Sequence, residues 1–306
     1  MSVLGCRRWA GRIVLASCIT VPCLAISCEG LRSYNRRVYE ILANLQRGSV
    51  VLDLGCGGGS FPAGGHTVIR VDHTLSAPKA DGIFVCGDAA ILPVKSSSLD
   101  AVVCHHSLEH FSELDAVLEE IGRTVKPQGA LFVSVPDAST LTDVVYRWLS
   151  HGGGHVNAFR NSGDLIRRIT AHTGLPHRAT RPLFSSLSFL NRASRTAWPP
   201  RRLLLLGGGA EWSLRLYLLA SRWADRWLRT RLSFYGWAMY FGAIGDSIDE
   251  TGWCNVCIRC GSSSPSESLK SAGSVRRRWG MFRVYECPQC STWNFFFDDK
   301  NFRHVR

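Results

Sequence analysis

Residues 50–59 read Val-Val-Leu-Asp-Leu-Gly-Cys-Gly-Gly-Gly, and this stretch decides the fold. A short apolar run that ends in an acid and a series of glycines predicts a buried strand followed by a tight turn. Glycine tolerates positive φ and lets a ligand lie against the backbone. The loop alone is weak evidence for a ligand, because a tight strand-to-helix turn needs glycines even in an unliganded protein.

Further short apolar runs follow this strand, separated by helical or turn-forming segments. We expect strands over 67–71, 83–85, 101–104 and 130–135, and helices over 34–45, 115–125, 162–173 and 211–232. Residues 176–200 look irregular and basic. Short apolar strands that alternate with helices or loops predict a parallel sheet in an α/β fold.

Two acids stand where a nucleoside ligand would need them. Asp72 ends the second expected strand, 19 residues beyond Asp53, and a carboxylate there could accept both hydroxyls of a ribose. Asp88 follows the third strand, where its carboxylate and the backbone amide of Ala89 could hold an adenine. The alternatives are a helix cap at Asp72 and an ordinary turn at Asp88.

The order of these motifs resembles the class I S-adenosylmethionine-dependent methyltransferases, in the small-molecule branch that has a Leu-Glu-His segment (108–110) after strand four. The resemblance covers about 34–175 and implies a Rossmann-like, doubly wound, mostly parallel sheet. It places the methionine part of the cofactor beside Asp53, Gly55 and Gly57. It places the ribose beside Asp72 and the adenine beside Asp88 and Ala89. The sulfonium is expected beside His105. The adjoining Cys56 and His73 complete the expected cofactor-binding set.

One stretch departs from the family pattern. Only 12 residues separate Gly59 from Asp72, and Pro62, Gly64 and Gly65 are among them. The family has a full helix at this place, whereas we expect one turn or a loop here. The contribution of a helix dipole to binding the cofactor's carboxylate is therefore in doubt.

Methyl transfer from a sulfonium needs alignment more than bond chemistry, and a base helps only if the acceptor carries a proton. The candidate bases are His106, His110 and His155, because imidazole titrates near neutral pH. The alternatives are structural, since His110 lies in a family segment and His155 could cap the following helix. The sequence leaves the acceptor open.

Two C-x2-C pairs, Cys257/Cys260 and Cys287/Cys290, are separated by 26 residues. Each pair could place two thiolates on one tetrahedral ion, so together they predict a structural Zn²⁺ site of the zinc-ribbon kind. The alternatives are coincidental thiols or a redox pair, and Cys254 is a possible substitute ligand. Strand-like segments 282–285 and 293–297 flank the pairs.

The other cysteines do not suggest a disulfide framework, because Cys56, Cys86 and Cys104 stand singly in apolar or Gly-rich segments. This distribution favours a reducing compartment, and we expect the protein in the cytoplasm. The basic and then apolar N-terminus (residues 1–30) has the outline of a signal peptide or anchor. A packing helix or a misplaced start codon are the alternatives.

The net charge of +12 is concentrated in the middle of the chain, where 176–231 holds eleven arginines and no lysine. Trp212, Trp223 and Trp227 recur at helical spacing there. Such a helix could pack on the protein's own core, cover a lipophilic substrate or lie on a membrane surface. Nucleic acid is a further possible partner of the basic patches, including 276–278.

These features predict four parts: residues 1–30, a cofactor-binding core over 31–175, a basic helical lid or substrate region over 176–250 and a zinc-ribbon-like unit over 251–306. The function expected first is a methyltransferase for a small or lipophilic acceptor. The rivals are an RNA methyltransferase, a zinc-knuckle binding protein with a degenerate Rossmann unit, and a nicotinamide oxidoreductase. The last usually has G-x-G-x-x-G and would give the Leu-Glu-His segment no role.

Overall fold

The computed structural model describes residues 41–74, 76–149, 154–194, 209–244, 248, 252–278, 280 and 282–302. The chain divides into two compact units, each assembled from three segments. Unit 1 contains Met1–Val135, Asn161–Ala179 and Met239–Ile248, and unit 2 contains Pro136–Arg160, Thr180–Ala238 and Asp249–Arg306. The four-part division stays a prediction, and its first part, residues 1–30, lies outside the described residues.

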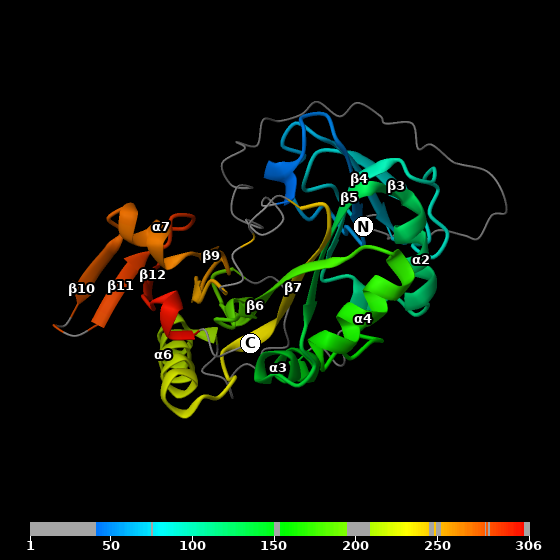
Figure 1. Ribbon diagram of the computed structural model, residues 1–306. Coiled ribbons are helices and arrows are strands. Elements are labelled where there is room, and N and C mark those ends of the chain that lie inside the picture. The colour runs from blue at the N-terminus through cyan, green and yellow to red at the C-terminus, as the bar shows by residue number, and fades with distance from the viewer. Residues whose placement is uncertain are drawn as a thin grey trace. The chain divides into compact units, whose positions relative to one another are not determined.

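A seven-stranded sheet in the order β3-β2-β1-β4-β5-β7-β6 is the main element of the fold (Figure 1). Its strands are β1 (Val50–Leu54), β2 (Thr67–Asp72), β3 (Ile83–Cys86), β4 (Leu99–His105), β5 (Val125–Pro136), β6 (His177–Phe184) and β7 (Phe234–Gly242). β1 pairs in parallel with β2 and β4, β2 with β3, and β4 with β5. The Rossmann-like, mostly parallel sheet predicted from the sequence is confirmed.

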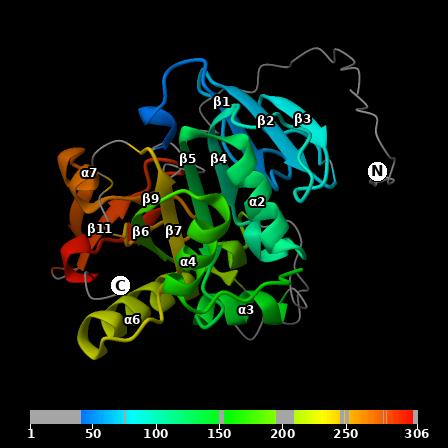
Figure 2. The ribbon, with the colours of Figure 1, turned by 45° about the vertical axis from the view of Figure 1, so that its right-hand side comes forward.

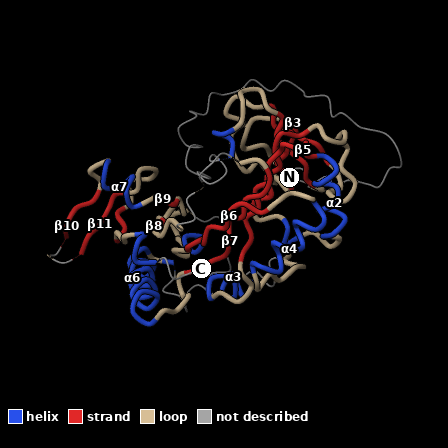
Figure 3. Tube along the Cα trace, in the orientation of Figure 1, coloured by secondary structure: helices blue, strands red, loops and turns tan. Residues whose placement is uncertain are grey.

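Strands buried on both faces explain the continuous apolar runs in unit 1. Val51 and Leu52 of β1 and Val102 and Val103 of β4 have no exposed surface, as expected for central strands of a parallel sheet. Helices α2 (Leu114–Thr124) and α4 (Ser162–Thr173) lie side by side (Figure 3). The predicted bounds of α4 are confirmed, and those of α2 differ by one residue at each end.

The missing helix between β1 and β2 is also confirmed, because residues 56–66 form turns only. Figure 2 shows β1, β2 and β3 next to one another, joined here without a covering helix. Of the helix expected over 34–45, the described part comprises residues 41–45, of which 41–44 are helical.

Several elements were not predicted, including one helix and two strands of the main sheet. α3 (Leu141–Leu149) and β7 were overlooked, and the segment expected to be irregular after residue 176 contains β6. Two arginines and Pro182 interrupt the apolar pattern of β6, which concealed the strand. Since β6 lies at the edge of the sheet, the missing N–H of Pro182 costs no central ladder bond. The side chain of Arg181 is buried with its guanidinium 4.7 Å from the Trp253 ring.

Unit 2 combines helices with a small cysteine-rich module, defined here as residues 252–302. Besides α3, it contains η2 (Ser188–Leu190), α6 (Glu211–Leu228), β8 (Asn255–Val256), β9 (Ser263–Ser264), α7 (Ser266–Ser271), β10 (Val275–Arg278), β11 (Phe282–Glu286), β12 (Trp293–Phe295) and η4 (Asp299–Phe302). β10, β11 and β12 form an antiparallel sheet, and β8 pairs with β9. Leu214 and Leu218 of α6 pack with Leu149 and Ile258 in one apolar cluster.

The tryptophans of α6 do not face this cluster. Leu214, Leu218 and Arg222 are on the buried side of α6, whereas the side chains of Trp212 and Trp227 are 63% and 73% exposed. Packing on the protein's own core is therefore the wrong interpretation for Trp212 and Trp227, whereas the ring of Trp223 stacks on that of Phe282. A second stripe at helical spacing, which includes polar residues, forms the buried face instead.

None of the described helices is both long and apolar enough to cross a membrane. Cys56 and Cys104 are buried free thiols, as expected. Cys86 is disulfide-bonded, which corrects the expectation that it is a free apolar residue.

Candidate functional site

The carboxyl ends of four parallel strands bring most of the predicted cofactor residues to one edge of the sheet in unit 1. Gly55 and Gly57 follow β1, Asp72 ends β2, Asp88 follows β3 and His105 ends β4. Strand order reverses between β1 and β4, since β2 and β3 lie on one side of β1 and β4 and β5 on the other. Ligands of open α/β sheets bind in the crevice at such a switch point.

The glycine loop approaches its surroundings more closely at Gly55 than at Gly57. Gly55 has φ +70°, and a Cβ there would lie 2.5 Å from the Cβ of Ser107 in the loop after β4. Gly57 has φ +52°, and nothing lies within 4 Å of the position of its Cβ. Gly55 is therefore required for packing, whereas Gly57 leaves open space where a ligand could lie against the backbone.

The carboxylate of Asp53 supports this loop from inside. It is fully buried, and its Oδ2 accepts hydrogen bonds from Ser60 N (2.8 Å) and from Arg70 Nη1 (2.5 Å). Arg70 also donates to the backbone carbonyls of Phe61 and Asp81. Burial raises the pKa of Asp53, against the opposing effects of Ser60 and Arg70. The Asp53–Arg70 pair therefore holds the loop where the family has a helix.

Asp72 joins the glycine loop to the end of β2. Its Oδ2 accepts a hydrogen bond from Gly57 N at 2.8 Å, and its Oδ1 accepts one from Thr74 N at 3.0 Å. The exposed His73 has its Nδ1 3.2 Å from Oδ1 of Asp72. Each carboxylate oxygen has a second lone pair, so Asp72 keeps acceptor capacity for a ligand.

The segment after β3 lies next to Asp72, because Gly87 N donates to the carbonyl oxygen of Asp72 at 3.0 Å. Asp88 is exposed and accepts a hydrogen bond from Ala90 N at 2.9 Å, which makes a local turn. Ala89 is buried. Asp88 therefore forms a turn, which was the alternative role expected for it. This turn lies next to Asp72, the residue expected to bind the ribose.

The end of β4 places two histidines together. His105 Nδ1 lies 2.7 Å from Ser134 Oγ of β5, and its ring is 4.4 Å from that of His106. His106 has φ +51°, a left-handed conformation that costs free energy in a non-glycine residue and is concentrated at functional sites. Its Nδ1 is 3.7 Å from Oε1 of Glu109, a side chain that is only 2% exposed.

The three candidate bases differ in exposure and in the unit to which they belong. His110 is exposed at the end of η1 (Leu108–His110) in unit 1. His155 belongs to unit 2, where its Nδ1 is 3.5 Å from Oδ1 of the buried Asp143 and its ring stacks on Tyr146 at 5.2 Å. Within unit 1, the buried carboxylate of Glu109 lies 3.7 Å from His106 Nδ1 and within 4.8 Å of a ring nitrogen of His110.

Cys56 lies in the loop but is a poor nucleophile. Its side chain is buried, and this burial, together with the charges of Asp53 and Asp72, raises its pKa to about 12. The thiol therefore stays protonated at neutral pH, and its part in the site is to shape the loop.

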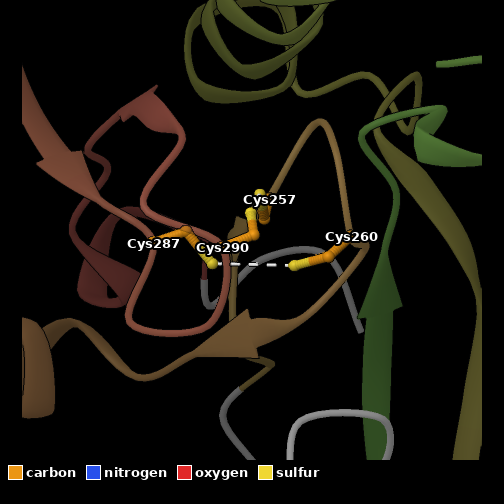
Figure 4. Close-up of side chains that lie close together, drawn as sticks. All are labelled: Cys257, Cys260, Cys287 and Cys290. Carbon is orange, nitrogen blue, oxygen red and sulfur yellow. Dashed lines mark hydrogen bonds between the residues drawn. The ribbon is translucent and has the colours of Figure 1, made fainter. Parts of the chain in front are cut away.

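The four cysteines predicted as metal ligands come together in unit 2 (Figure 4). Their sulfur atoms all lie within 4.8 Å of one another. Cys257 and Cys290 are 3.5 Å apart at sulfur, and Cys260 and Cys287 are 3.6 Å apart. Four Zn–S bonds of about 2.3 Å in a tetrahedron predict sulfur separations of about 3.8 Å, so the cluster fits zinc.

Each cysteine pair lies in the same kind of turn. Cys257 N donates to Ser262 O at 2.9 Å, and Cys287 N donates to Thr292 O at 2.9 Å. The residue after each pair, Gly261 or Ser291, has positive φ. Cys254 is not a substitute ligand, because its buried sulfur lies 2.9 Å from Oδ1 of Asp299.

Sequence reasoning missed three residues around the cofactor edge. Arg70 and Glu109 are buried charges, and Ser134 contacts His105 from the neighbouring strand. A signal existed for Arg70, because a charge inside the apolar run 68–71 needs a buried partner. The sequence contains no such signal for Ser134, since its contact with His105 depends on the pairing of two strands.

Comparison with known proteins identifies the domain that carries this edge. Residues 52–133 match the family described as "Methyltransferase domain". The chain is similar to a malonyl-[acyl-carrier protein] O-methyltransferase of Methylococcus capsulatus, with 27% identity over 54% of this chain and 65% of that protein. It is also similar to a tRNA (carboxymethyluridine(34)-5-O)-methyltransferase of Macaca fascicularis, with 32% identity over 32% of this chain and 16% of that protein.

A demethylmenaquinone methyltransferase of Renibacterium salmoninarum is 33% identical over 36% of this chain and 50% of that protein. The chain thus spans less than two thirds of the length of these relatives, and the family match over 52–133 contains the glycine loop. The matched region and the sheet topology agree with each other. The chain therefore carries a class I S-adenosylmethionine-dependent methyltransferase domain on a Rossmann-like α/β fold, together with a four-cysteine cluster near its C-terminus.

Proposed function

We propose that this protein is an S-adenosylmethionine-dependent methyltransferase that acts on a small or lipophilic acceptor and contains a structural zinc ion. The observation that carries the proposal is the hydrogen bond from Gly57 N to Asp72 at 2.8 Å, inside the region that matches the methyltransferase family. This bond joins a backbone with open space above it to a carboxylate with spare acceptor capacity. A nucleoside ligand needs both features.

In this proposal Gly55, Cys56 and Gly57 border the methionine part of the cofactor, and Asp53 acts indirectly by fixing the loop through Arg70. Asp72, flanked by His73, accepts the ribose hydroxyls. Asp88 and Ala89 hold the adenine, and His105, fixed by Ser134, forms the wall beside the sulfonium. When bound, S-adenosylmethionine supplies a methyl group that is activated by the positive sulfur.

His106 is the base we favour for an acceptor that must lose a proton, with His110 and His155 as alternatives. Glu109 lies beside its Nδ1 and would stabilise the protonated ring. The strained backbone of His106 fixes the direction of the side chain from the end of β4. An acceptor with no proton to lose would need only alignment.

Zinc is the ion we propose for Cys257, Cys260, Cys287 and Cys290, because all four ligands are thiols at tetrahedral separations. A site with four protein ligands has no open coordination position. The ion would therefore fold the cysteine-rich module and take no part in methyl transfer.

The exposed face of α6 supports a lipophilic acceptor reached at a membrane surface. Trp212, Leu216, Trp223 and Trp227 lie on this face, and Arg226 and Arg229 are the charged residues exposed on it or beside it. Tryptophan with arginine is the composition of helices that lie in the membrane interface, and arginine favours anionic lipids. We place the reaction on the cytoplasmic side, where the cofactor is made.

The first test is a calorimetric titration of the full chain with S-adenosylmethionine. We expect binding of the cofactor and none of NADH, and we expect Asp72→Ala to lower the affinity by about 100-fold through loss of charge-assisted hydrogen bonds. Asp100→Ala is the matched control. Asp100 also accepts a backbone hydrogen bond at 2.8 Å, from Val50 N, but it lies where β4 begins, at the opposite edge of the sheet.

Failure of the folded chain to bind S-adenosylmethionine at millimolar concentration would reject the proposal and favour a binding protein. The acceptor is identified by adding labelled S-adenosylmethionine and the protein to a cell extract and finding what becomes methylated. A labelled lipid or small molecule is expected. Labelled RNA, with RNA binding that falls steeply as salt rises, would instead support an RNA methyltransferase.

A further inference from the structure

Unit 2 contains a pocket of about 180 Å³ between α6 and the cysteine-rich module. Trp223 of α6, Phe282 of β11 and Phe295 of β12 are among the aromatic side chains that line it. The rings of Trp223 and Phe282 are stacked with centroids 6.5 Å apart, and those of Phe282 and Phe295 are 5.4 Å apart. The walls are therefore suited to an apolar or aromatic group.

The charged side chains that line this pocket are mostly cations. Arg222, Arg226 and Arg283 contribute three guanidinium groups, and Asp298 is the single acid. Asp298 already forms an ion pair with Lys270 at 3.0 Å, outside the pocket lining. The pocket thus has an excess of positive charge that no lining residue neutralises.

Arg222 is the most unusual of these cations. Its side chain has no exposed surface, and its guanidinium donates to the backbone carbonyls of Cys254 (2.9 Å), Ser233 (3.3 Å) and Ser185 (3.4 Å). Its Nε has no hydrogen-bond partner, and no carboxylate among the described residues forms an ion pair with it. Besides these carbonyls, the rings of Phe184 (4.7 Å) and Phe302 (6.0 Å) and the charge of Asp225 act on the guanidinium, but a buried charge without a contact ion pair remains unfavourable.

The buried Arg70 of unit 1 has the partner that Arg222 lacks, a carboxylate in direct contact with its guanidinium. Its guanidinium is 2.5 Å from the carboxylate of Asp53, so both buried charges are neutralised. Arg222 is equally buried, and the electrostatic attraction of Asp225 takes the place of a contact ion pair. Consistent with this, burial lowers the pKa of Arg222 below its ordinary value.

We propose that this pocket binds a small anion, a phosphate or carboxylate, that is attached to an aromatic or apolar group. The anion offsets the charge of Arg222 through the low-dielectric interior and pairs with Arg226 and Arg283, and the apolar part lies among the aromatic rings. This site lies entirely in unit 2 and goes beyond the methyl-transfer proposal. The same chemistry occurs in a soluble aryl or alkyl phosphate and in an anionic lipid headgroup.

The test uses phenyl phosphate as the probe, titrated calorimetrically into the full chain with zinc supplied. We expect a Kd below about 1 mM, with weaker binding of inorganic phosphate, which lacks the ring, and no binding of benzyl alcohol, which lacks the charge. Arg226→Gln and Arg283→Gln are each expected to weaken phenyl phosphate binding by at least about tenfold, because each removes one charged hydrogen-bond donor. Arg222→Met is not needed, so loss of folding cannot obscure the result.

Arg277→Gln is the matched control, because Arg277 is the exposed cross-strand partner of Arg283 on β10 and does not line the pocket. We expect its affinity for phenyl phosphate to stay unchanged. No binding at 10 mM probe (about ten times the expected Kd), or equal weakening by Arg277→Gln, would overturn the proposal and leave Arg222 with a structural role only. Competition by phosphatidylglycerol vesicles would assign the site to a lipid headgroup, and its absence would assign it to a soluble ligand.

Discussion

The glycine loop after β1 and the two cysteine knuckles of unit 2 both shape a ligand site, but they are held in different ways. Each knuckle is closed by hydrogen bonds within its own six residues, such as those that link Cys257 to Gly261 and Ser262. The glycine loop depends on Arg70, Asp72 and the loop after β4, which all come from other strands. A local motif such as the knuckle can therefore be predicted from the spacing of its residues, whereas the shape of the glycine loop depends on tertiary contacts.

This difference has a consequence for substitution. A knuckle fails when one ligand is lost, since a metal site needs all of its ligands at once. The glycine loop should instead lose stability or affinity according to which of its supports is removed. The following experiments separate these behaviours.

The largest effect is expected from Cys287→Ser. Removal of one of the four thiolates should reduce bound zinc from one ion per chain to a trace and abolish the cooperative unfolding of the cysteine-rich module. Metal analysis and near-ultraviolet circular dichroism measure both changes. Cys254→Ser is the control, because Cys254 is a buried cysteine outside the cluster and should leave zinc content intact. Full zinc content in Cys287→Ser would mean that the four thiols do not form the site.

A smaller but still large loss is expected from Arg70→Met. The substitution leaves Asp53 as an uncompensated buried carboxylate, which should lower the free energy of unfolding by about 3–5 kcal/mol. Arg168→Met is the control, because Arg168 pairs with Asp115 at 2.6 Å on the surface and should cost less than about 1 kcal/mol. Urea denaturation measures both. Equal losses would show that the Asp53–Arg70 pair does not support the loop.

The third experiment separates ligand contact from backbone strain. Gly57 and Gly174 both have positive φ and nothing within 4 Å of the Cβ position, so alanine at either should cost about 1–2 kcal/mol of stability. Only Gly57→Ala should also weaken S-adenosylmethionine binding, by about tenfold or more, because its methyl group would occupy the space left for the ligand. Calorimetric titration of both variants tests this. Equal affinities in the two variants would place the cofactor away from Gly57.

Much of the architecture was predictable because it depends on short-range patterns. Continuous apolar runs marked β1 to β5, glycine and proline marked the missing helix, and the C-x2-C spacing marked the metal cluster. The edge of the sheet that holds Asp72 followed from strand polarity alone. These features need no knowledge of which residues meet across the sheet.

The unpredicted features all depend on contacts between distant segments. β6 was concealed by arginines and Pro182, whose tolerance depends on an edge position. The tryptophan face of α6 looked like a core because helical periodicity marks a stripe but not which stripe is buried. Arg222 and Asp225 lie in the buried stripe because backbone groups outside α6 form hydrogen bonds with them, although the Nε of Arg222 has no hydrogen-bond partner.

The smallest expected effect concerns a third distant support of unit 1 and its dependence on pH. Glu120 of α2 accepts hydrogen bonds from Arg123 at 2.6 Å and from Leu92 N, in the turn after β3, at 2.7 Å. The hydrogen bond from Arg123 is the main cause that lowers the pKa of Glu120. A lowered pKa in the folded state contributes stability that is full above the ordinary value near 4.5 and is lost as pH falls through the folded value.

Glu120→Gln should therefore cost about 1 kcal/mol at pH 7 and progressively less as pH is lowered below 4.5, until the two proteins are equally stable. Urea denaturation at a series of pH values measures the difference. Glu113→Gln, an exposed glutamate just before α2, should show almost no difference at any pH. A cost of Glu120→Gln that stays constant with pH would mean that the geometry of the hydrogen bonds matters and the charge does not. The hydrogen bonds of Glu120 on α2 would then stabilise unit 1 through their geometry, whereas the Asp53–Arg70 pair stabilises the glycine loop through its charges.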